Sequence, residues 1–206
     1  MPPGAHAASR ATSDIAGVLL AGGRARRLGG VAKPLLTLGD RSLLSRGREA
    51  LAGAGASPIV AVGPHTDEPG LVWVREDPPF GGPVAAIAAA LAYEGVACSH
   101  RVLLLAADLV HPEAIVRRLI AESSADTAAE ALVLRADGRP QWLAGLYRTS
   151  SLRTALAALG TVQGASCRAL LGGLAIRWIQ DQDGITADID TPAELARARA
   201  EYEEPR

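Results

Sequence analysis

The chain has 206 residues, a length that suits one well-buried α/β domain and is short for two. Its apolar fraction of 49% comes mainly from Ala, Leu and Val, and no apolar run approaches the length of a membrane-spanning helix. The formal net charge of −1 gives no global reason to expect a nucleic acid or an anionic membrane as a partner. Composition therefore predicts a single domain whose charges act locally.

Residues 1–13 are rich in Ala, Pro, Ser and Gly and lack the apolar core, roughly 7–15 residues long, of a secretory signal. We expect a disordered leader there, followed by one domain over residues 14–206. The two cysteines, Cys98 and Cys167, are too far apart in sequence for a CxxC metal site. Because both lie among small apolar residues, we interpret them as reduced, semi-buried thiols of a cytoplasmic protein.

Predicted strands and helices alternate along the chain. The predicted strands cover residues 15–20, 58–62, 71–74, 101–107, 131–134, 142–147 and 174–179. The predicted helices cover residues 42–54, 84–93, 112–121, 150–159, 166–171 and 191–203. This alternation indicates βαβ units in a mostly parallel, right-handed sheet flanked by helices.

Small and acidic residues follow four of the predicted strands: the Gly22-Gly23 pair, Gly63, Asp77 and Asp108. In open α/β sheets, ligands bind beyond the carboxyl ends of the strands. We therefore expect these residues to meet at one edge of the sheet.

The segment from Leu20 to Lys33 reads LAGGRARRLGGVAK. It matches neither the P-loop nor the dinucleotide fingerprint GxGxxG, because its glycines are spaced differently. Four glycines offer bare backbone N–H groups, and the cations between and after them can meet phosphate oxygens. An ordinary basic turn is the alternative, but the combination favours a triphosphate site in which Arg24 and Arg27 serve the phosphates and Arg26 is solvated.

A strand followed by LAGG, a basic loop, a glycine and a lysine resembles the molybdenum cofactor guanylyltransferase (MobA-like) family of nucleotidyltransferases. The resemblance implies a single Rossmann-like α/β domain. It also implies that the backbone of Leu20, Ala21, Gly22 and Gly23 holds the guanine nucleotide and that Lys33 contacts it.

Asp108 ends the most apolar predicted strand. A helix cap or a loop salt bridge is the alternative role, whereas the resemblance implies a Mg²⁺ ligand. In the family this aspartate precedes Thr or Met and then Pro, and here the segment is Asp-Leu-Val-His-Pro.

Two further positions compare with the nucleotide site of the family. Asp77, in Arg-Glu-Asp, matches a Glu-Asp pair and implies a nucleotide contact, although a solvated turn residue is an equal alternative. Gly63 stands where the best-known enzymes have an Asn that contacts the nucleotide. Because glycine has no side chain, only its backbone could contact the nucleotide here. The loop Phe80-Gly81-Gly82-Pro83 resembles the Gly-Pro-Leu-Ala-Gly segment, which implies that it flanks the acceptor.

The C-terminal segment Asp188-Ile189-Asp190-Thr191-Pro192-Ala193-Glu194 resembles the terminal signature of the superfamily. A capping box from Thr191 to Glu194 explains the start of a last helix. It does not explain the aspartates, and we expect Asp190, or alternatively Asp188, to complete a metal site with Asp108. Trp142 and Tyr147 also lie in a family-like segment, but we interpret them as core.

The resemblance implies transfer of GMP from GTP to the phosphate of Mo-molybdopterin, with Mg²⁺ as cofactor and catalytic roles for Arg27, Lys33 and Asp108. GTP and molybdopterin are then the small-molecule partners, with weak contacts to molybdoenzymes or proteins of the cofactor pathway. We find no Ser-His-Asp or Cys-His pattern that would indicate a covalent intermediate. The alternatives are a sister nucleotidyltransferase that uses CTP or another nucleotide, and a non-catalytic nucleotide-binding domain.

Overall fold

The computed structural model describes residues 14–22, 32–124 and 128–203, so the predicted leader lies outside the described residues. The strands are β1 (Ile15–Leu20), β2 (Thr37–Leu38), β3 (Arg41–Ser42), β4 (Ile59–Val62), β5 (Val72–Val74), β6 (Arg101–Ala106), β7 (Ala131–Ala136), β8 (Arg139–Arg148) and β9 (Ile176–Gln180). The helices are α1 (Leu43–Gly53), α2 (Pro83–Ala92), α3 (Glu94–Ala97), α4 (Pro112–Ser123), α5 (Thr149–Leu159), α6 (Cys167–Leu171) and α7 (Pro192–Glu203), with a 3-10 turn η2 (Lys33–Leu35).

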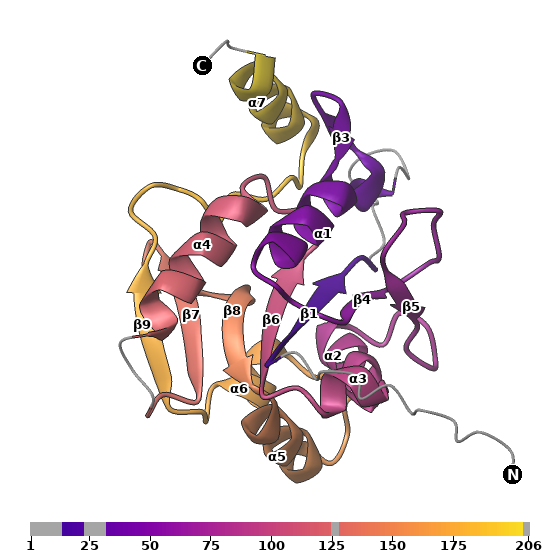
Figure 1. Cartoon of the computed structure of the whole chain (residues 1–206), viewed down its shortest axis with the longest axis vertical. Coiled ribbons are helices and arrows are strands. Elements are labelled where there is room, and N and C mark those ends of the chain that lie inside the picture. The colour runs from indigo at the N-terminus through magenta and orange to yellow at the C-terminus, as the bar shows by residue number, and fades with distance from the viewer. Residues whose placement is uncertain (1–13, 23–31, 125–127, 204–206) are drawn as a thin grey trace, which may run out of the picture.

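The central sheet has the strand order β5-β4-β1-β6-β8-β7-β9 (Figure 1). Its first four strands are parallel neighbours, β8 is antiparallel to both β6 and β7, and β9 is parallel to β7. The predicted mostly parallel α/β sheet is therefore confirmed, with β8 as the reversed strand.

Helices cover both faces of the sheet (Figure 1). On β6, Leu103 and Leu105 pack into one buried cluster, which α1 and α4 complete, whereas Val102 and Leu104 pack into the other. Helices α2, α5 and α6 cover that second face. Because successive side chains of a strand point to opposite faces, a strand covered on both sides must be apolar throughout, which explains the sequence of β6.

A third, smaller cluster joins three segments that are far apart in the sequence. Leu38 in β2 and Leu43 in α1 pack with Val110, Ile189 and the α7 residue Ala198. The phenol group of Tyr202 in α7 donates to the backbone carbonyl of Val110 at 3.0 Å. The last helix is thereby fixed over the segment that follows β6.

The structure corrects some details of the predicted elements. The hairpin of β2 and β3, the turn η2 and the short helix α3 are additional, because elements of two to four residues carry no measurable periodicity. Both cysteines are free thiols, but Cys98 is exposed rather than semi-buried. Among the described helices, none is long and apolar enough to cross a membrane.

Candidate nucleotide-binding site

The carboxyl ends of four adjacent parallel strands form one edge of the site. Ala21, after β1, donates its N–H to Val62 at the end of β4 (2.9 Å), and Ala107, after β6, donates to Leu20 (3.1 Å). Gly63 in turn donates to Val74 at the end of β5 (3.1 Å). The structure thus brings together the strand ends that the sequence analysis singled out.

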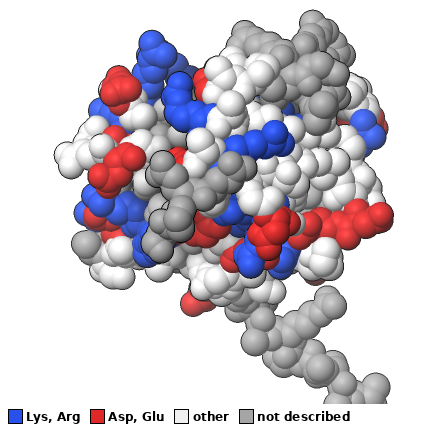
Figure 2. All heavy atoms as spheres, turned by 90° about the horizontal axis from the view of Figure 1, so that it is seen from above, with Lys and Arg blue, Asp and Glu red and all other residues white. Residues whose placement is uncertain are grey.

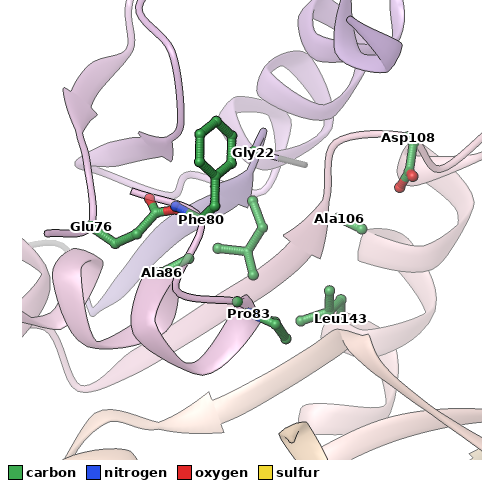
Figure 3. Close-up of a pocket in the computed structure, with 10 residues that line it drawn as sticks. Gly22, Glu76, Phe80, Pro83, Ala86, Ala106, Asp108 and Leu143 are labelled. Carbon is green, nitrogen blue, oxygen red and sulfur yellow. The ribbon is translucent and has the colours of Figure 1, made fainter. Parts of the chain in front are cut away.

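A cavity of about 680 Å³ opens at this edge (Figure 3), a size common for small-molecule and cofactor sites. Its walls come from β1, from the β5–α2 loop and α2, and from β6 and β8. They are Leu20, Gly22, Glu76, Phe80, Gly82, Pro83, Ala86, Ala106, Asp108 and Leu143.

Three carboxylates gather at one end of the cavity. Asp108, Asp188 and Asp190 each place one carboxylate oxygen within 4.8 Å of the others. Two backbone hydrogen bonds hold the segments together: Val110 donates to Ala187 (2.9 Å), and Ile189 donates to Asp108 (3.2 Å).

Lys33 is the only lysine in the sequence, and its ammonium group contacts this cluster. Its Nζ lies 3.3 Å from Asp108 Oδ2 and also donates to Asp190. Partial burial by itself lowers the pKa of Lys33, but the hydrogen bond to Asp190 and the charges of both aspartates outweigh it, so the pKa lies above its ordinary value. Lys33 is therefore charged and partly neutralises the cluster.

Asp188 completes the cluster, but its carboxyl group ionises less readily than that of an ordinary aspartate. Desolvation, followed by the negative charges of Asp108 and Asp190, raises its pKa above the ordinary value. Three oxygen donors with surplus negative charge suit a hard divalent cation such as Mg²⁺ or Mn²⁺. The residues present thus fit the expected metal.

Local hydrogen bonds fix the two aspartates of the C-terminal segment. Asp181 accepts from the backbone N–H groups of Ile185 (3.0 Å) and Thr186 (2.9 Å) and from the Thr186 hydroxyl (2.6 Å), which shapes the loop before Asp188. Glu194 accepts from the N–H groups of Asp190 (2.8 Å) and Thr191 (2.7 Å). Because Glu194 N–H also donates to Thr191 Oγ1 at 3.3 Å, the predicted capping box is confirmed.

Gly63 brings the β4 end unusually close to the β1 end. Its φ is +153°, and a Cβ at this position would lie 2.9 Å from both the carbonyl carbon of Ala21 and the nitrogen of Gly22. A side chain would therefore collide with backbone, which explains why no Asn can occupy this place in the present structure.

The other residues predicted to contact the nucleotide differ in whether they line the cavity. Leu20 and Gly22 line the cavity, and Ala21 is buried beside them. Asp77 is exposed and is not among the residues lining the cavity, whereas its neighbour Glu76 is. Gly23, Arg24 and Arg27 lie outside the described residues.

Glu76 and Leu143 were not singled out from the sequence. A signal for Glu76 is present in the sequence, since it is a charged residue two positions beyond β5 and directly before Asp77. Leu143 had none, because an apolar residue in a strand is indistinguishable from core before the fold is known.

A second cavity, of about 320 Å³, adjoins the first and shares Ala106, Asp108 and Leu143 with it. Its other walls include Gln141, Trp142, Cys167, Thr186 and Asp188. Trp142 thus lines a cavity as well as packing edge-on against Trp178, so its interpretation as a plain core residue was incomplete. Tyr147 is fully buried, as expected, and its phenol donates to the carbonyl of Trp142 (2.7 Å).

Figure 2 shows the molecule from above, with Lys and Arg side chains interspersed among Asp and Glu side chains. Opposite charges on the described part of this face are therefore mixed. Among the described residues, the group placed to attract a phosphate at the site is Lys33 rather than a broad basic surface.

Residues 17–179 match the MobA-like NTP transferase domain. Solved structures of similar fold include molybdopterin-guanine dinucleotide biosynthesis protein A from Archaeoglobus fulgidus (22% identity, TM-score 0.62, 90% of this chain and 97% of that chain covered). A 2-C-methyl-D-erythritol 4-phosphate cytidylyltransferase from Thermus thermophilus is similar too (19%, 0.66, 92% and 98%). The Mycobacterium tuberculosis protein Rv0371c, in complex with manganese, is a third (21%, 0.64, 92% and 99%). These likenesses show the fold, and the domain match over most of the sequence shows that the chain belongs to the MobA-like NTP transferases, a family of nucleotidyltransferases.

Proposed function

We propose that this chain transfers GMP from GTP to the terminal phosphate of Mo-molybdopterin and releases pyrophosphate. The observation that carries the proposal is the meeting of two cavities at one acidic cluster. A nucleotide in the larger cavity and a phosphorylated acceptor in the smaller one would both reach Asp108, which lines each of them. The similarity to the Archaeoglobus protein supports molybdopterin as the acceptor.

The reaction is a displacement at the α-phosphorus. An oxygen of the acceptor phosphate forms the new P–O bond, and the bond from the α-phosphorus to the α,β-bridging oxygen breaks, so that the electron pair leaves with pyrophosphate. Since the acceptor phosphate is already an anion, no strong general base is required. Catalysis rests on positioning and on neutralisation of charge.

The residues of the site have different roles in positioning and charge neutralisation. The backbone of Gly22 lies at the cavity wall, where it can approach the nucleotide closely, and Lys33 supplies a compact positive charge. Asp108, Asp188 and Asp190 would hold the divalent cation, which when bound neutralises the charge on the phosphates and on the leaving pyrophosphate. Asp77, Arg24 and Arg27 remain proposed nucleotide contacts.

Cytidylyl transfer to another phosphorylated acceptor is the second candidate. One observation keeps it open: Gly63 presents no side chain that could select a guanine over another base. The similarity in fold to the Thermus cytidylyltransferase is compatible with either base.

A pyrophosphate-release assay distinguishes the two candidates. Purified protein with Mg²⁺ receives GTP, CTP or ATP, each with molybdopterin, and released pyrophosphate is measured. We expect GTP to be the best donor, and faster release from CTP would replace the guanylyl proposal by the cytidylyl one.

The variant Asp108→Asn should lower release at least about 100-fold, because it removes a metal ligand that neutralises transition-state charge. The matched control is Asp14→Asn. It removes an exposed carboxylate just before β1, whereas the site lies at the carboxyl end of that strand. If Asp108→Asn retains the activity of the control, Asp108 has no catalytic role.

A further inference from the structure

Phe80, in the β5–α2 loop, has a backbone that phenylalanine rarely adopts. Its φ is +67°, in the left-handed region, where a side chain with a Cβ is strained. Its side chain is 53% exposed, so burial of the ring in the core does not compensate for this strain. Strained residues that a fold does not need are concentrated at binding sites.

Contacts on both sides hold Phe80 in this conformation. Its N–H donates to Glu76 Oε1 at 3.0 Å, and both residues line the larger cavity. On the other side, the carbonyl of Gly81 accepts from the N–H of Gly164 at 2.8 Å. The backbone of the loop is therefore held at the cavity wall before any ligand binds, and the guanidinium carbon of Arg75 lies 6.0 Å from the centre of the Phe80 ring.

Phe80 and the acidic cluster lie at different ends of the cavity. Figure 3 shows Glu76 and Phe80 on one side of the cavity and Asp108 on the other, with Pro83 and Leu143 between them. Lys33, together with a cation that the carboxylates would hold, would attract the phosphates of a nucleotide to the Asp108 end. The base, at the other end of such a nucleotide, would then lie beside Phe80.

We propose that Phe80 stacks on the nucleobase of the bound nucleoside triphosphate and that Glu76 positions it by accepting its N–H. The inference rests on the proposed function, because a nucleotide whose phosphates lie beside Asp108 brings its base to this end of the cavity. It differs from the acceptor-flanking role that the sequence resemblance implies for this loop. Every base has a π-face, so the stack strengthens binding without selecting the base.

The test uses Phe80→Gly, because glycine accepts the left-handed backbone and keeps the fold. Binding of GTP, CTP and inorganic triphosphate is measured by titration calorimetry in Mg²⁺, without acceptor. We expect both nucleotides to bind about tenfold more weakly than to the unchanged protein, the usual size of one base–aromatic stack. Inorganic triphosphate has no base and should bind equally to both proteins.

Two further variants sharpen the comparison. Phe80→Tyr keeps the ring and should keep nucleotide affinity. Leu35→Ala is the matched control, since Leu35 is a similarly exposed large hydrophobic residue (48%) that does not line the cavity. Its nucleotide affinity should be unchanged.

The role of Glu76 is tested by rescue. Glu76→Ala removes the acceptor for the Phe80 N–H and should weaken nucleotide binding, whereas Glu76→Gln keeps a carbonyl acceptor and should restore it. A merely structural role would change inorganic triphosphate binding as well.

The inference is overturned if Phe80→Gly binds nucleotides as tightly as the unchanged protein, or if it loses affinity for inorganic triphosphate to the same extent. Different results would overturn the proposed function. If the unchanged protein binds no nucleotide, the family activity itself is absent. If nucleotides bind but no pyrophosphate is released, the binding comparison at Phe80 still stands.

Discussion

At the scale of single residues, Lys33 bears most directly on metal binding, because its ammonium group is paired with carboxylates that a divalent cation would need as ligands. It contacts both Asp108 and Asp190, two of the three candidate metal ligands. A divalent cation has twice the charge and takes several oxygen ligands, so it should displace the ammonium from these carboxylates. The released ammonium can then turn to the nucleotide phosphates. An arginine would not serve as well, because its guanidinium is larger and planar.

This exchange can be measured because Lys33 is the only lysine of the chain. An amine-reactive acylating reagent followed by peptide mass spectrometry reports on this one side chain. The raised pKa should make labelling slow without ligands, since acylation requires the neutral amine. Mg²⁺ alone should accelerate labelling several-fold, and Mg²⁺ with GTP should suppress it again.

The α-amino group in the same sample is the internal control, and its labelling should not respond to either addition. Equal labelling of Lys33 with and without Mg²⁺ would show that the cation leaves the Lys33 contacts intact.

At the scale of elements, the carboxylate of Asp181 holds the conformation of the loop between β9 and the acidic cluster. Asp181 accepts three hydrogen bonds from Ile185 and Thr186. Desolvation raises its pKa, but the bonds from Thr186 and the neighbouring backbone outweigh this, so its pKa lies below the ordinary 3.8. A lowered folded-state pKa means that the carboxylate stabilises the fold above about pH 4 and ceases to do so as the pH falls through the folded value.

The variant Asp181→Ala should therefore lose about 1–2 kcal/mol of unfolding free energy at pH 7, because the N–H groups of the loop lose a charged acceptor. The difference from the unchanged protein should shrink below pH 4. Urea unfolding at pH 7 and pH 3 in a metal chelator measures it. Metal affinity should also fall, since this loop leads to Asp188, and a variant as stable as the unchanged protein at pH 7 would refute the role of Asp181.

The elements also show which parts of the fold can be read from the sequence. The β6 strand and the capping box at Thr191 were predictable, because their signals lie within a few neighbouring residues. The β2–β3 hairpin was not, because it is held by packing of Leu38 against residues far along the chain. The choice between Asp188 and Asp190 could not be made either, and the structure brings both to Asp108 through the backbone pairing of Leu109 with Asp188.

At the scale of the whole molecule, the site joins distant parts of the chain. Lys33 and Asp190 are separated by 157 positions, and their contact lies beside the cluster that fixes α7. A ligand that binds here requires the ends of β1, β6 and the segment before α7 to be in place. It can therefore bind only the folded protein, and its binding energy adds to the stability of the domain.

Saturation with Mg²⁺ and GTP should consequently raise the melting temperature. At a ligand concentration of about 100 times Kd the gain is roughly 2.7 kcal/mol. For a domain of this size, each kcal/mol corresponds to about 2–4 °C, so a shift of roughly 5–10 °C is expected in differential scanning fluorimetry. Asp108→Asn should lose most of the shift and Asp14→Asn should keep it, because only the first removes a carboxylate of the cluster. A shift of equal size in both variants would mean that the nucleotide binds away from Asp108, and the assignment of the cavity would have to be abandoned while the fold remained.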